Sequence, residues 1–182
     1  RVGLLLGLSG SLFFGLNAYM GNLLEQQGHF NLLADALFWY NLAQVAASLV
    51  MLRMARPWVG RKFPIILSAF FSLAGALGAL VLNGWWAIAS ATFMSLTAGI
   101  LLILLVALPP LLVDPGETGR LSAGNFLVGY TLAFSIPMIG GVLADWTGDA
   151  QNAILFIIAY GVLVLPLAFT LNLKRQKAQP EN

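Results

Sequence analysis

Residues 63–113 read FPIILSAFFSLAGALGALVLNGWWAIASATFMSLTAGILLILLVALPPLLV and contain no charged side chain. This run is too long for one buried helix or strand. It is long enough for two helices that each cross about 30 Å of hydrocarbon. The turn residues Asn83 and Gly84, followed by two tryptophans, divide it. The run therefore predicts two membrane-spanning helices, at about Pro64–Leu82 and Trp85–Leu108.

The overall composition also indicates a chain that is embedded in a lipid bilayer. Hydrophobic residues make up 59% of the chain and charged residues 9%, whereas a soluble domain has about 25% charged residues. Water could not solvate such a surface, so a large soluble core is excluded. There is no cysteine, which excludes disulfides and thiolate metal sites. The composition therefore predicts an integral membrane protein.

Four more apolar segments of membrane-spanning length lie outside residues 63–113, each bounded by turn or polar residues. They run from about Val2 to Leu24, Ala36 to Leu52, Leu121 to Leu143 and Ala153 to Leu171. Backbone in lipid must satisfy its own hydrogen bonds, so the segments are expected to be helices. We therefore predict an all-α membrane protein with six transmembrane helices in one domain, residues 1–173, followed by a polar tail at residues 174–182.

The charges test the number of crossings. When the helix ends are assigned alternately to two sides, all nine Lys and Arg fall on one side: Arg1, Arg53, Arg56, Arg61, Lys62, Arg120, Lys174, Arg175 and Lys177. The other side holds Glu25, His29, Asp35, Asp145 and Asp149. The positive-inside rule makes the cationic side cytoplasmic. Both termini and the tail are therefore expected in the cytoplasm, and RMARPWVGRKFP at residues 53–64 is expected to be the loop between the second and third helices.

Polar side chains recur at helical spacing in four of the six segments. They are Asn17, Tyr19, Asn22 and Gln26 in the first, Tyr40, Asn41, Gln44 and Ser48 in the second, Thr92, Ser95 and Gly99 in the fourth, and Ser122, Asn125, Gly129 and Tyr130 in the fifth. Residues three or four apart share one face of a helix. Two interpretations stay open: a polar cavity lined by these four helices, or hydrogen bonds between helices, worth about 1 kcal/mol each.

Several enzyme and metal-site interpretations are excluded because the sequence lacks residues that they require. GLSG at residues 7–10 resembles the serine motif of intramembrane proteases, but that chemistry needs a histidine base within reach. The only histidine, His29, falls in a loop on the acidic side. Glu25 and His29 have no third ligand to complete a metal site. No ionisable residue lies near the middle of a segment, where proton relays and ion pathways are found. We therefore expect no cofactor, no metal and no enzyme activity.

Two short motifs resemble those of the major facilitator superfamily. Gly60–Arg61–Lys62 matches the end of that family's cytoplasmic loop signature. GGVLADWTGD resembles the Gly-x-x-x-Asp-x-Thr-Gly that closes its eleventh helix, through Gly141, Asp145, Thr147 and Gly148. The chain thus resembles the C-terminal six-helix half of such a transporter over essentially its whole length.

Within the superfamily, the chain is most similar to the cyanate and nitroimidazole transporter-like group. YMGNLLEQQG at residues 19–28 keeps that group's Leu24 and Gly28, with Tyr19 in place of Trp and Gly21 in place of Pro. Residues 107–148 are closer to the group. The resemblance implies two inverted three-helix repeats. In that arrangement the first and fourth helices line a cavity, the second and fifth flank it, and the third and sixth lie outside.

The function implied is secondary-active transport of a small polar or anionic solute by alternating access, in a bacterial inner membrane. The residues expected to contact the solute are Asn17, Tyr19, Tyr40, Gln44 and Asn125. The expected partners are membrane lipid, the solute, and a missing N-terminal six-helix half or a second copy of this chain, without nucleic acid. The chain begins at Arg1 and not at methionine, so we expect a piece of a longer protein. The alternative is a stand-alone six-helix membrane protein with a structural or partner-binding role.

Overall fold

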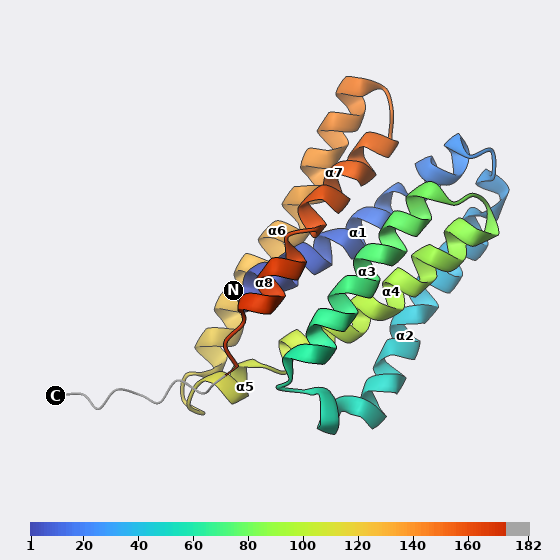
Figure 1. The fold of residues 1–182 in the computed structure, drawn as a ribbon. Helices are drawn as coiled ribbons and strands as arrows, with labels where there is room; N and C mark the ends of the chain where they lie inside the picture. Colours follow the sequence, from blue (N-terminus) through green and yellow to red (C-terminus); the bar gives the residue numbers. More distant parts are fainter. Residues whose placement is uncertain (174–182) are drawn as a thin grey trace.

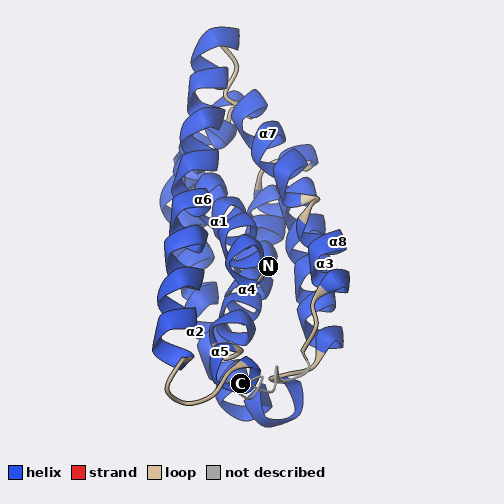
Figure 2. Ribbon diagram, turned by 90° about the vertical axis from the view of Figure 1, so that its left-hand side faces the viewer, coloured by secondary structure: helices blue, strands red, loops and turns tan. Residues whose placement is uncertain are grey.

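The structure, a computed structural model, describes residues 1–173, and every regular element in that part of the chain is a helix. Figure 2 shows these helices joined by short loops. In chain order they are α1 (Val2–Gln26), a 3-10 turn (Phe30–Leu32), α2 (Leu33–Trp58), α3 (Lys62–Val81), α4 (Trp85–Val106), α5 (Pro109–Leu112), α6 (Thr118–Thr147), α7 (Gln151–Gly161) and α8 (Val164–Thr170). The predicted tail, with Lys174, Arg175 and Lys177, lies outside the described residues.

Six helices of the described chain are long and apolar enough to cross a membrane, when α7 and α8 are counted as one crossing. The predicted all-α fold with six such helices is therefore confirmed. The connections from α1 to α2, from α3 to α4 and from α6 to α7 lie at the upper end of the bundle in Figure 1. Those from α2 to α3 and from α4 to α6 lie at the lower end, so successive crossings alternate in direction.

Helix α2 is longer than predicted. It continues to Trp58, so Arg53 and Arg56 lie in its last turns and the loop shrinks to residues 59–61. The prediction of a loop over all of residues 53–64 was wrong. The charged residues mark where the hydrocarbon ends, but the helix can continue beyond that point. Arginine is a good helix former, so Arg53 and Arg56 extend α2 instead of ending it. The helix stops one residue after Pro57, and the chain then turns through Gly60 at a φ of 78°.

The sixth crossing is interrupted in the middle. Pro166 has no N–H to donate to the carbonyl of Val162, four residues earlier. That carbonyl accepts instead from the N–H of Leu165, at 3.2 Å, and the helix restarts as α8. The predicted span from Ala153 to Leu171 is therefore one crossing made of two helices.

Small residues allow the closest helix contacts. A Cβ on Gly75 of α3 would lie 2.8 to 2.9 Å from the backbone and Cβ of Met94 on α4. A Cβ on Gly7 of α1 would lie 2.9 Å from the carbonyl oxygen of Gly129 on α6. Helices in membranes associate through such close backbone approach, because lipid provides no hydrophobic force between them. Helices α1 and α4 are the most buried of the long helices, and α2 and α6 are the most exposed.

Charged side chains separate to the two ends of the bundle. At one end, the Arg1 guanidinium donates to the carbonyl of Thr170 at 2.8 Å, and Lys62 Nζ donates to that of Phe169 at 3.5 Å. At the other end, Gln26 Nε2 donates to Asp149 Oδ1 at 2.9 Å. The described Lys and Arg thus share one end of the fold, and the far end carries only acidic charges and His29.

This separation makes a direct prediction about the membrane. Single cysteines replacing Arg56 and Arg120 are expected to react with an impermeant thiol reagent from one side, and those replacing Asp35 and Asp149 from the other. The chain itself has no cysteine, so the background is clean. Labelling of positions 56 and 149 from the same side would show that the number of crossings between them is not the one in the structure.

Candidate functional site

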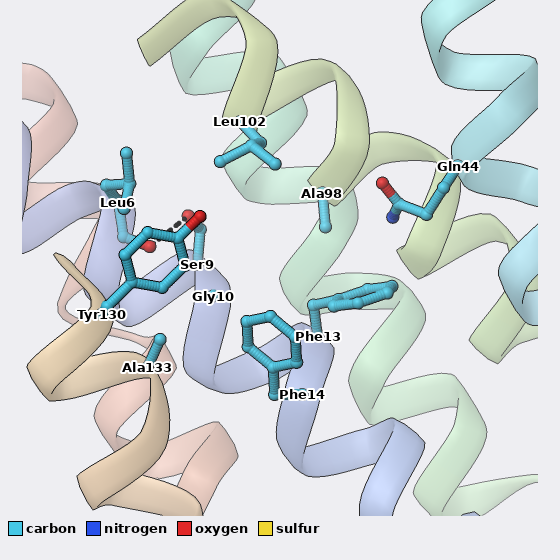
Figure 3. A pocket seen from close by; sticks show the side chains of 10 residues that line it. All are labelled: Leu6, Ser9, Gly10, Phe13, Phe14, Gln44, Ala98, Leu102, Tyr130 and Ala133. Atoms are coloured by element: carbon cyan, nitrogen blue, oxygen red, sulfur yellow. Dashed lines mark hydrogen bonds between the residues drawn. The ribbon is translucent and has the colours of Figure 1, made fainter. Parts of the chain in front are cut away.

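A cavity of about 90 Å³ lies where four helices meet (Figure 3). Helix α1 contributes most of its lining, with Ser9, Phe13 and Phe14 among others. Gln44 comes from α2, Ala98 and Leu102 from α4, and Tyr130 and Ala133 from α6. None of the lining residues comes from α3, α7 or α8. The four helices are those in which the sequence predicted polar faces.

The lining is more apolar than the polar stripes suggested. Its polar side chains are Ser9, Gln44 and Tyr130, and the others are aromatic, aliphatic or glycine. Ser9 Oγ donates to the carbonyl of Leu6, within its own helix, at 3.1 Å. The cavity therefore offers few polar atoms to a solute, placed among apolar walls, which is the usual composition of a small-molecule site.

Gln44 is anchored at the edge of this cavity by Ser95 of α4. Its Nε2 donates to the carbonyl oxygen of Ser95 at 2.7 Å and to Ser95 Oγ at 3.1 Å. Ser95 Oγ in turn donates to the carbonyl oxygen of Tyr40 at 2.6 Å. Gln44 thus lines the cavity and also joins α2 to α4. The polar stripe was predicted either to line a cavity or to form hydrogen bonds between helices, and Gln44 does both.

Tyr40 lies one turn from Gln44 on α2 but serves a helix contact. Its side chain is completely buried, stacks on Phe13 with ring centroids 5.2 Å apart, and donates its hydroxyl to the carbonyl of Phe13 at 2.8 Å. Phe13 is itself part of the cavity lining. Tyr40 therefore does not line the cavity itself. It packs behind Phe13 and holds in place the ring that forms part of the cavity wall.

Tyr19 lies toward the acidic end of the bundle. Its hydroxyl donates to the carbonyl of Pro137 on α6 at 2.9 Å. It lines a separate cleft of about 620 Å³ between α1 and α6, together with Glu25 and Asp145. The structure therefore does not bring Tyr19 together with Gln44.

Asn125 lies toward the cationic end of α6, in a cleft of about 460 Å³ that also contains Arg1. Its Nδ2 is buried and has no hydrogen-bond partner among the described residues. Asn17 is half-buried on α1, one turn beyond Phe13, and is not among the residues that line the central cavity. Of the five predicted contacts, Gln44 and Tyr40 are neighbours at the cavity, and the other three are spread along α1 and α6.

A ladder of aromatic rings beside the cavity was missed. Phe126, Tyr130 and Phe134 stack in succession along α6, with centroids 5.8 and 6.1 Å apart. Phe14 of α1 extends the ladder by stacking on Phe134 at 4.9 Å. The three α6 residues are spaced four apart, which places them on one face of a helix. That spacing can be read from the sequence, but a prediction based on polar side chains does not include the phenylalanine rings.

Because Gln44 donates hydrogen bonds to Ser95 on α4, we expect that replacing Gln44 lowers the stability of the fold modestly. We expect Gln44→Leu to lower the free energy of unfolding by about 1 kcal/mol, because it removes a hydrogen bond between helices. Asn41→Leu is the matched control, since the Asn41 amide is exposed and donates only within α2, to the carbonyl of Leu37. Unfolding by SDS titration in mixed micelles compares the two. Equal effects would mean that the contact with Ser95 carries no stability.

No protein-family model, no curated protein and no solved structure matches the chain. The resemblance to the major facilitator superfamily therefore stays a prediction from residue patterns.

Proposed function

We propose that the chain is one half of a secondary transporter that moves a small solute across a membrane by alternating access. The observation that carries the proposal is the central cavity, which four of the six crossings build together. It lies beside an exposed face, on which Tyr130 and Phe134 are 48% and 52% exposed. A second six-helix bundle on that face would enclose a solute between the halves, near the midplane.

The packing of the helices supports two related triplets. Helix α1 packs on α6, and α4 packs on α2; α3 lies beside α4, and α7 lies beside α1. Exchanging the triplet α1–α2–α3 with the triplet α4–α6–α7/α8 turns each of these contacts into another, whereas the contact of α6 with α7 has no counterpart of similar extent between α2 and α3. Repeats of inverted topology that exchange helices in this way are common in transporters.

Two further features fit this function. Helix α6 contains Pro137 and the pair Gly140–Gly141 in its interior, and such positions allow a helix to bend. The described cations gather at one end, which we assign to the cytoplasmic side of a bacterial inner membrane. Lysine and arginine in that position set topology and can meet the second half at the cytoplasmic face.

The proposal requires that the cavity meets water and not lipid. A bimane fluorophore on Ala98→Cys in the intact protein is expected to be quenched by iodide and not by nitroxide-labelled lipid. Ala74→Cys is the matched control, because Ala74 is an exposed alanine on α3, away from the cavity. It is expected to show the opposite pattern. Quenching at position 98 by lipid nitroxides, without quenching by iodide, would rule out a solute path on this face.

A further inference from the structure

We infer that the cleft around Asn125, at the cationic end of the bundle, binds the phosphate group of an anionic phospholipid. Three observations carry this inference: a buried amide donor without a partner, an arginine in each of the two clefts that Asn125 lines, and apolar walls beside the polar ones. The site is separate from the central cavity, so it goes beyond the proposed transport and is tested without it.

The side-chain amide of Asn125 has a donor that the described chain does not use. Its Nδ2 is buried, and no described residue accepts a hydrogen bond from it. A buried donor without an acceptor costs stability, so native folds nearly always provide one. Helix α6 is held against α1 at this residue, because a Cβ on Gly3 would lie 3.1 Å from the Asn125 carbonyl oxygen. The amide is therefore a positioned donor for an acceptor that comes from outside the described chain.

Two arginines bring positive charge to this amide. Asn125 lines two adjoining clefts: the larger, of about 460 Å³, contains Arg1, and the smaller, of about 320 Å³, contains Arg120. One N–H of the Arg1 guanidinium donates to the carbonyl of Thr170, and a guanidinium has five N–H donors. Among the described residues, no acidic side chain lines the larger cleft, and Glu117 is the acidic one in the smaller. The ligand that fits these donors is an anion.

The walls of the larger cleft indicate a lipid headgroup instead of a free anion. Beside its polar residues it is lined by aliphatic side chains, those of Val2, Leu112, Val113, Leu121 and Leu171. An apolar cavity of about 150 Å³ holds one benzene, so a cleft of about 460 Å³ has room for a phosphate and the first part of its acyl chains. Basic pockets between transmembrane helices on the cytoplasmic side bind anionic headgroups in this way.

The experiment follows thermal unfolding of the purified intact protein in a neutral detergent while dioctanoyl phosphatidylglycerol is added. A ligand that binds the folded state raises the unfolding midpoint, so the concentration that gives half of the full rise reports the affinity. We expect this concentration to be about tenfold lower than for dioctanoyl phosphatidylcholine, which has a phosphate but no net charge. Inorganic phosphate is expected to give no rise at the concentration at which phosphatidylglycerol acts.

Asn125→Leu tests the amide. It should raise the half-effective concentration of phosphatidylglycerol about tenfold, because hydrogen bonds to charged groups are the stronger ones. Without lipid its unfolding midpoint should be no lower than that of the parent, since the amide donates to no described residue. Asn41→Leu is the matched control. The Asn41 amide is exposed on α2, outside both clefts, and its loss should leave the half-effective concentration unchanged.

Arg120→Gln tests the charge. It should raise the half-effective concentration about fivefold, the usual worth of one cation near anionic lipid. Arg53→Gln makes the same chemical change at an exposed position in the last turns of α2, outside both clefts, and should leave that concentration nearly unchanged. If Asn125→Leu does not fold, this pair of arginine variants decides.

Three results would overturn the inference. Equal half-effective concentrations of phosphatidylglycerol and phosphatidylcholine would show that no anion is selected. A rise of the midpoint with inorganic phosphate at the concentration of phosphatidylglycerol or below would show a site for a free anion. Equal effects of Arg120→Gln and Arg53→Gln would show that surface charge alone attracts the lipid. None of these results bears on the proposed transport, which depends on whether position 98 meets water.

Discussion

Replacing Tyr40 by alanine is expected to lower the free energy of unfolding by about 3–4 kcal/mol, the usual cost of truncating a fully buried aromatic ring. Tyr40 has no exposed surface, stacks on Phe13 and donates its hydroxyl to the Phe13 carbonyl. Alanine removes the ring and the bond together and leaves a hole between α1 and α2. Since Phe13 forms part of the cavity wall, loss of the ring also frees that wall to move.

Two controls separate the contributions at this position. Tyr40→Phe keeps the ring and removes only the hydroxyl, so we expect a loss of about 1 kcal/mol. Tyr160→Ala truncates a tyrosine that is 44% exposed on α7 and should cost much less than Tyr40→Ala. SDS titration in mixed micelles measures all three. Equal losses for Tyr40→Ala and Tyr160→Ala would show that Tyr40 is not buried at the contact of α1 with α2.

Gly75→Leu is expected to cost about 3 kcal/mol, the upper part of the usual range for overpacking. The atoms that a Cβ at this position would meet include the backbone nitrogen and Cα of Met94, at 2.9 Å. Backbone cannot turn aside as a flexible side chain can, so α3 and α4 must separate. Small residues at such contacts are what holds membrane helices together.

Gly124→Leu is the matched control for Gly75→Leu. It lies inside α6, and a Cβ there would meet nothing within 4 Å. The same chemical change should therefore leave the unfolding midpoint in SDS nearly unchanged. A similar loss for both variants would mean that the cost does not come from the contact between α3 and α4.

The number and type of the elements were predictable because lipid restricts the choices so strongly. Residues 63–113 can only be two crossings, and the charge pattern admits six in all. The ends of the helices were harder to predict. Arg53 and Arg56 belong to the last turns of α2, since charge marks where the hydrocarbon ends and helical hydrogen bonds can continue beyond it.

For the candidate site, the sequence predicted which helix faces take part but not which residues on those faces line the cavity. Tyr40 and Gln44 share one stripe of α2, yet Tyr40 points into the contact with α1 and Gln44 reaches the cavity edge. Helical spacing cannot separate them, because the difference depends on how α1 crosses α2. Asn125 and Pro137, the residue that Tyr19 contacts, are 12 residues apart on α6, or about 18 Å along a helix axis. That separation follows from the pairing of α1 with α6 and not from any local pattern.

The aromatic ladder likewise could be predicted within one helix but not between two helices. The spacing of Phe126, Tyr130 and Phe134 is local and readable in the sequence. The addition of Phe14 from α1 depends on the packing of two helices more than a hundred residues apart in the chain. A pattern on one helix could have predicted a stack of three rings, but not that the stack leads to the central cavity.

The function that we propose requires that the cavity opens alternately to the two sides of the membrane. Its most direct test is the labelling of Ala98→Cys by an impermeant thiol reagent in right-side-out and inside-out vesicles of the intact protein, with Ala74→Cys as the control. We predict that position 98 reacts from both sides, that blocking by a reversible reagent from one side prevents labelling from the other, and that position 74 reacts from neither. Labelling of position 98 from one side only, or from none, would contradict the claim.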